Sequence, residues 1–120
     1  MPTVFSMAPL HNVHDIHVQT AKGRLFVIDI YESGAGNYDS TVTVLDKASV
    51  SRSYHTEAKS TSANDNFKMA VEFIQSYLAS IDSSDSIVKI HNPCNCPFVY
   101  ETEQNIIVSD LGINIKVLVN

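Results

Sequence analysis

The stretch that decides the fold is residues 62–82, which read SANDNFKMAVEFIQSYLASID. Apolar residues recur in it at intervals of three and four, so they share one continuous helical face. Ser62 and Asp65 stand where a helix N-terminus needs capping side chains. The sequence therefore predicts one amphipathic helix over residues 65–81. The apolar face of this helix consists of Phe67, Ala70, Val71, Ile74, Tyr77, Leu78 and Ile81.

Strand patterns precede this helix. Apolar and polar residues alternate over 16–19, and a nearly continuous apolar run follows over 25–31. A glycine-containing turn separates the two runs, so residues 16–31 are predicted to form a β-hairpin. Alternation recurs at 41–45 and at 50–54. We expect four strands before the helix.

Short apolar segments follow the helix at 87–90, 98–100 and 106–108, and an alternating segment covers 113–119. Each of these segments is predicted to be a strand. The chain length suits a single domain over residues 1–120, with its C-terminal strands at about 87–119. The expected fold is α+β, with a mostly antiparallel sheet of six to eight short strands and one helix packed on one face.

The charge balance weighs against nucleic acid as the main partner. The 120 residues include 8 Lys or Arg and 13 Asp or Glu, for a formal net charge of −5. The cations are dispersed singly, whereas phosphate binding needs clustered Lys and Arg. The excess of acids is concentrated in the last third of the chain. This pattern favours a basic protein partner.

The cysteine content predicts a reducing compartment. Cys94 and Cys96 are one residue apart, and a disulfide between them would close a very small, strained ring. We therefore expect a cytoplasmic location. The sequence also lacks the long apolar run of a membrane-spanning helix, so no membrane partner is expected.

Two groups of residues have metal-ligand chemistry. His91, Cys94 and Cys96 supply the imidazole and thiolates that zinc prefers, in a loop stiffened by two prolines. A fourth ligand is missing from this loop and would come from elsewhere, such as His11, His14 or His17. The alternative is a turn in which two small residues are cysteines. The three N-terminal histidines also suit a solvated, pH-sensitive polar patch.

Signatures of catalysis are absent from the sequence. It contains no Gly-x-Ser-x-Gly elbow, no phosphate-binding Walker loop and no dinucleotide-binding glycine motif. A thiol of Cys94 or Cys96 activated by His91 or His55 is the one catalytic pairing that the residue types allow. We therefore do not expect an enzyme.

Asp29 interrupts the most apolar predicted strand. Strand alternation places it on one face with Leu25, Val27 and Tyr31. A carboxylate on such a face needs a partner or a shifted pKa. Either the face is partly exposed, or it forms a binding surface with Tyr31 as an aromatic contact.

These observations favour a small acidic protein-binding module. The expected function is that of an inhibitor or immunity-type protein, as in toxin–antitoxin pairs, which occludes a basic partner such as a toxin nuclease or a nucleic-acid-handling enzyme. One alternative is a zinc-binding or thiol-dependent domain using the loop from His91 to Cys96. Another is a structural subunit that assembles, for example as a homodimer, through a strand edge. The predicted partner-binding residues are Asp82, Asp85, Glu101, Glu103, Tyr31, Tyr38 and Tyr100.

Overall fold

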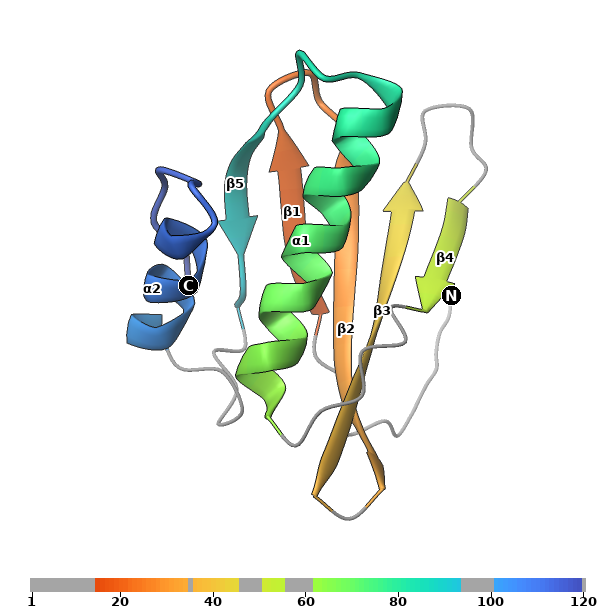
Figure 1. Cartoon of the computed structure of the whole chain (residues 1–120), viewed down its shortest axis with the longest axis vertical. Coiled ribbons are helices and arrows are strands. Elements are labelled where there is room, and N and C mark those ends of the chain that lie inside the picture. The colour runs from red at the N-terminus through yellow and green to blue at the C-terminus, as the bar shows by residue number, and fades with distance from the viewer. Residues whose placement is uncertain (1–14, 35, 46–50, 56–61, 94–100, 120) are drawn as a thin grey trace.

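The computed structural model describes residues 15–34, 36–45, 51–55, 62–93 and 101–119. It has an α+β fold in which five antiparallel strands form one sheet, in the order β4-β3-β2-β1-β5 (Figure 1). Helix α1 lies across one face of the sheet, and helix α2 lies beside β5. The elements are β1 (Asp15–Thr20), β2 (Leu25–Gly34), β3 (Asn37–Leu45), β4 (Ser51–His55), α1 (Ala63–Ile81), β5 (Ile87–His91) and α2 (Glu101–Asp110).

The first four strands follow the alternation of the sequence. In β2, Phe26, Ile28 and Ile30 are fully buried, while the residues between them are only half-buried. The predicted hairpin is confirmed, because β1 pairs antiparallel with β2 and places Ile16 opposite Ile28. One side of the sheet therefore forms the core against α1, and no described helix covers the other side.

Helix α1 confirms the predicted amphipathic segment and begins two residues earlier than expected. Ser62 is its N-cap, and the Ser62 hydroxyl accepts a hydrogen bond of 3.3 Å from the Asp65 backbone N–H. Phe67 and Ile74 are fully buried against the sheet. Ile81, which the periodicity assigned to the same face, is 48% exposed because it is the last residue of the helix.

Of the strands predicted after the helix, the one at 87–90 is confirmed as β5, and those at 106–108 and 113–119 are wrong. Residues 106–108 belong to helix α2, and 113–119 form only an isolated bridge, between Leu118 and His91. The segment 98–100 lies outside the described residues. The described chain thus has five strands and two helices, instead of six to eight strands and one helix.

The end of α2 explains this difference. Gly112 has a φ of 80°, its N–H donates to the Ser109 carbonyl, and the Ile113 N–H donates to the Val108 carbonyl at 2.9 Å. This is the hydrogen-bond pattern of a Schellman C-cap, in which a left-handed glycine ends a helix. From the sequence alone, the same glycine suggests a turn between two strands.

Two isoleucines of α1 provide a matched test of this core. Ile74→Ala is expected to lower the free energy of unfolding by about 2–5 kcal/mol, because it leaves a cavity under the helix. Ile81→Ala removes the same atoms from a half-exposed site and should change it by about 0.5 kcal/mol or less. Urea unfolding of both variants measures the difference. Equal losses would contradict the described position of α1.

Candidate functional site

One corner of the molecule is held by a network of charged side chains. It joins the turn between β1 and β2 to the loop between α1 and β5. Arg24 Nη1 lies 2.7 Å from Asp85 Oδ2 and 3.3 Å from Asp82 Oδ2. Lys22 Nζ lies 2.9 Å from the same Asp82 oxygen. The Thr20 hydroxyl also donates to Asp85 Oδ2, at 2.7 Å.

The two carboxylates of this corner are held ionised. Burial alone would raise the pKa of Asp85, but hydrogen bonds from Thr20, Arg24 and two backbone N–H groups outweigh it and lower the pKa to about 2. Hydrogen bonds from Ser84 and Lys22 hold the pKa of Asp82 well below its usual range.

This corner gives two of the predicted partner-binding residues an internal role. The Asp85 side chain is completely buried, and the Asp82 side chain is 22% exposed and paired with Lys22 and Arg24. A carboxylate in Asp85's position is not accessible to another protein. We therefore leave both residues out of the surface proposed below.

Replacing these two carboxylates tests the corner. Asp85→Asn is expected to lower the urea midpoint at neutral pH more than Asp82→Asn does, because only Asp85 is fully buried. A lowered pKa stabilises the fold above about pH 4, and this stabilisation is lost as the pH falls toward 2. The two variants and the wild type should therefore converge in acid. A loss for Asp85→Asn that is independent of pH would contradict this ionic role.

A second carboxylate environment lies on the sheet face opposite α1. Asp29 faces Asp15 directly in the β1–β2 register. Asp29 Oδ1 is buried and has no hydrogen-bond partner in the structure. Burial, together with the hydrogen bond to Asp15 and its charge, raises the pKa of Asp29 to about 8. Because this pKa lies above 7, Asp29 is largely protonated at neutral pH.

The Asp15–Asp29 pair is expected to cost stability as the pH rises. Because the pKa of Asp29 is raised, its favourable contribution is complete below about pH 4 and is lost as the pH rises to 8. Asp29→Asn should therefore raise the free energy of unfolding at pH 8 by about 1 kcal/mol, a figure reduced for partial solvent screening. The gain should vanish near pH 4.

The control for this measurement is Asp110→Asn, which makes the same chemical change at an exposed position. Denaturant unfolding from pH 4 to pH 8 compares both variants with the wild type. A gain for Asp29→Asn that is the same at both ends of the range would show that the raised pKa of Asp29 is not its cause.

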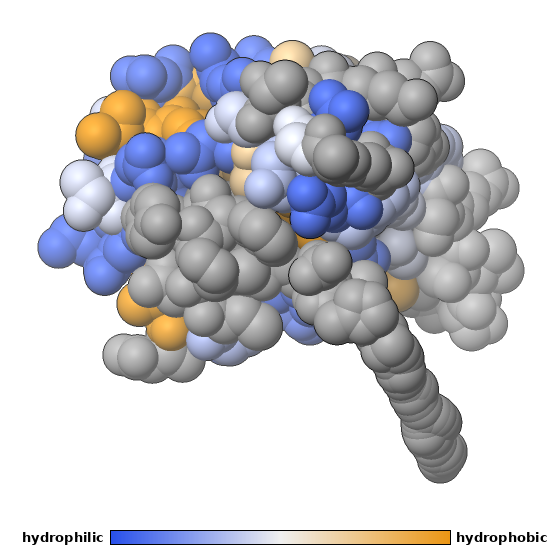
Figure 2. Space-filling view, turned by 90° about the horizontal axis from the view of Figure 1, so that it is seen from below, coloured by the Kyte–Doolittle hydropathy of each residue, from blue (hydrophilic) through white to orange (hydrophobic). Residues whose placement is uncertain are grey.

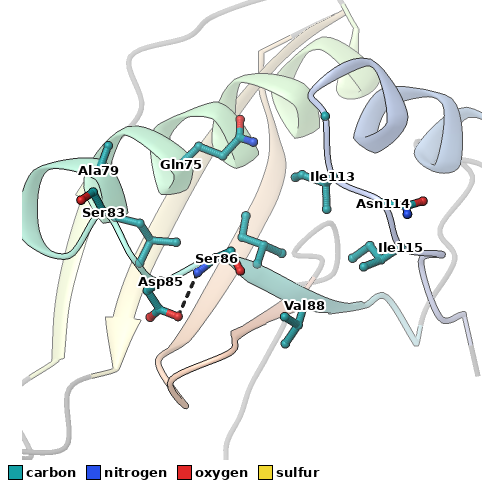
Figure 3. A pocket seen from close by; sticks show the side chains of 12 residues that line it. Gln75, Ala79, Ser83, Asp85, Ser86, Val88, Ile113, Asn114 and Ile115 are labelled. Carbon is teal, nitrogen blue, oxygen red and sulfur yellow. Dashed lines mark hydrogen bonds between the residues drawn. The ribbon is translucent and has the colours of Figure 1, made fainter.

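The hollow shown in Figure 3 lies between the end of α1, the start of β5 and residues 112–115. It has a volume of about 490 Å³. The Gln75 side-chain amide donates to the Leu111 carbonyl, and Asp85 accepts from the Ser86 N–H. The lining contains no histidine, cysteine or lysine. The carboxylate in the lining, Asp85, is already engaged by Thr20 and Arg24, so we assign this hollow no chemistry.

Helices α1 and α2 carry most of the net negative charge of the molecule. Five carboxylates lie on them against a single lysine, a balance of −4 compared with −5 for the whole chain. The six residues are Asp65, Glu72, Glu101, Glu103, Asp110 and Lys68. We call this surface the helical layer. Such a concentration of one sign steers oppositely charged partners toward it.

An apolar side chain is exposed among the charged residues of the helical layer. Ile106 of α2 is 55% exposed, the largest value among the large hydrophobic residues that the structure describes. On the α2 side of the molecule, Figure 2 shows exposed hydrophobic atoms bordered by hydrophilic ones. Next to Ile106, a groove of about 310 Å³ separates the start of α1 from α2. The groove is lined by Asn64, Asp65, Lys68, Glu103, Ile106 and Ile107.

The structure brings together only some of the predicted partner-binding residues. Glu101 and Glu103 lie in the first turn of α2, where acidic side chains also favour the helix dipole. Tyr31 lies on the sheet face opposite the helical layer, and Tyr38 packs against the core from β3. Tyr100 lies outside the described residues.

The sequence patterns do not mark Asn64 or Ile106 as binding residues. Asn64 was read only as part of a helix start, and Ile106 was assigned to a strand. Gln104 and Val108 are both buried and four residues apart, which is a helical spacing. This spacing would have placed Ile106 on the outer side of a helix.

Only part of the predicted zinc loop lies among the residues that the structure describes. His91 lies opposite His17 in the β1–β5 register, and both border a shallow hollow on the uncovered sheet face. Cys94, Cys96, His11 and His14 lie outside the described residues. Within the described ranges, no three His, Cys, Asp or Glu side chains are grouped so as to hold a metal ion. The zinc site stays a prediction.

Comparisons with known proteins add no assignment. No protein-family model matches the chain, and neither the curated proteins nor the solved structures include a significant match. Among the described residues, neither helix combines the length and apolar character needed to cross a membrane.

Proposed function

We propose that this chain is a protein-binding module that docks on a basic partner through its helical layer. The observation that carries the proposal is the −4 balance of α1 and α2 around the exposed side chain of Ile106. An apolar centre with a charged rim is a common design of protein interfaces. The carboxylates supply attraction and orientation, and the apolar side chain supplies area removed from water.

The form of action that suits this surface is occlusion. An inhibitor or immunity-type protein covers the active surface of its partner and opposes the partner's Lys and Arg residues with carboxylates. A toxin nuclease or another nucleic-acid-handling enzyme has such a basic surface, because it must bind phosphates. This proposal needs no catalytic group on the chain.

Assembly through the β5 edge of the sheet has less support from the described residues. The outer edge of β5 is already occupied near its end, because the Leu118 N–H donates to the Ile90 carbonyl and the Asn92 N–H donates to the Leu118 carbonyl. This pairing shortens the free edge of β5. The helical layer is therefore the better supported docking surface.

Charge reversal at the rim tests the proposal. Glu72→Lys and Glu101→Lys should each weaken the complex by roughly twofold to fivefold at low salt, as expected for exposed charge pairs. Both losses should shrink at high salt, because the interactions are screened. Glu32→Lys, an exposed change in the β2–β3 hairpin, is the matched control and should leave the affinity unchanged.

The partner is first isolated with the wild-type chain from the cells that make it, and native mass spectrometry then establishes the stoichiometry. Titration calorimetry with the purified partner gives the affinities of the wild type and the three variants. A one-to-one complex with a basic protein that weakens only in the helical-layer variants supports the function. A complex equally insensitive to all three reversals would exclude the helical layer as its interface.

A further inference from the structure

The groove between α1 and α2 contains two acceptor oxygens without donors. Glu103 Oε1 and Asn64 Oδ1 are both buried from solvent, and neither has a hydrogen-bond partner in the structure. Both residues line the same groove, one from each helix. Buried acceptors of this kind are rare in folded proteins because desolvation without a hydrogen bond is costly. A bound donor would remove this cost.

Among the described residues, no ion pair neutralises the carboxylates of the groove. Lys68 also borders the groove, but no ion pair joins its ammonium to Glu103 within the described chain. Asp65 adds a second carboxylate to the lining. The missing group is therefore a cationic donor and not a neutral one.

The shape and lining of the groove favour a guanidinium over an ammonium. A guanidinium carries five N–H donors in a planar fork and can serve two acceptors on different helices at once. Its alkyl stem is apolar and needs an apolar wall, which Ile106 and Ile107 supply at the α2 side of the groove. An ammonium is a compact, strongly hydrated charge and makes less use of such a wall.

We propose that the groove between Asn64 and Glu103 is the anchor site for one arginine side chain of the basic partner. This inference rests on the proposed function and names the group that the helical layer recognises. Both oxygens are buried in the unbound structure, so the two side chains turn into the groove to meet the guanidinium. The guanidinium then donates to Glu103 Oε1 and Asn64 Oδ1, and its stem packs on Ile106. The carboxylates at the rim then act on the surrounding charges of the partner.

The first test uses N-acetyl-arginine amide as the probe, without any partner. Titration into the ¹⁵N-labelled protein should move the amide signals of residues 64–68 and 103–107. The same titration with N-acetyl-lysine amide should give a dissociation constant about tenfold higher, and the neutral citrulline analogue should produce no saturable shift. Shifts that are equal for all three probes, or absent with arginine, would overturn the anchor site.

Variants then assign the contact. Glu103→Gln should weaken binding of the arginine probe by about tenfold, and Asn64→Ala by a smaller factor, because only Glu103 contributes a charge-assisted hydrogen bond. Glu32→Gln makes the same change at an exposed position of the β2–β3 hairpin, outside the helical layer, and should have little effect. Circular dichroism confirms that each variant is folded. Equal effects of Glu103→Gln and Glu32→Gln would show attraction by general charge alone and reject the site.

The two proposals fail in different ways. If the arginine probe does not bind but the partner complex still weakens on Glu72→Lys and Glu101→Lys, the anchor site is wrong and the docking surface stands. If the probe binds in the groove but the purified partner is not basic, the arginine site is supported and the proposed function is rejected.

Discussion

The buried carboxylate of Asp85 fixes the corner on which the arrangement of the elements depends. It accepts hydrogen bonds from Thr20 at the end of β1, from Arg24 at the start of β2, and from the backbone of Lys22 in the turn between them. One side chain from the α1–β5 loop thereby holds the whole first turn of the sheet. Because a buried charge must remain paired, this contact ties the end of α1 to one point of the sheet. Strand β5 leaves this corner beside β1, where it closes the edge.

The position of α2 follows from that edge and from a set of polar contacts. The Asn92 amide after β5 donates to Gln104 of α2 at 3.0 Å, and both side chains are fully buried. The Val117 N–H donates to Asn105 Oδ1 at 2.8 Å, and Gln75 of α1 donates to the Leu111 carbonyl. Directed hydrogen bonds fix orientation more closely than apolar contacts do, since each has a preferred distance and angle. They hold Glu103 and Ile106 beside the start of α1, where the groove forms.

The sequence predicted the parts of the fold that follow from a single period. The three- and four-residue spacing from Phe67 to Leu78 predicted α1, alternation predicted β1, β3 and β4, and a nearly continuous apolar run predicted β2. It failed at residues 106–108, because three consecutive apolar residues suit a buried strand and a helix equally well. The burial of Gln104 and Val108 four residues apart and the cap at Gly112 separate the two, and both depend on tertiary and backbone contacts that the apolar run alone does not reveal.

The site was predicted in the same partial way. Charge counting identified Glu101 and Glu103, because the acids cluster in the last third of the sequence. It also selected Asp82 and Asp85, whose partners Lys22 and Arg24 are about sixty positions earlier in the sequence. Whether a carboxylate faces solvent or an internal cation is decided by tertiary contacts. No sequence pattern marked Asn64 as a binding residue, since a polar residue in the first turn of a helix is ordinary.

The sheet order also has a consequence for how the chain folds. Strands β1 to β4 are consecutive neighbours, whereas β5 follows α1 in the chain and lies at the opposite edge of the sheet from β4 (Figure 1). His17 of β1 therefore pairs with His91 of β5 across a sequence separation of 74 residues. Closing so long a loop is entropically costly and slows folding. The four-stranded meander can form from local contacts, and we expect β5 and α2 to join it after α1 has docked. The acidic groove is thus among the last features to form, so partially folded chains lack the surface that would attract a basic partner.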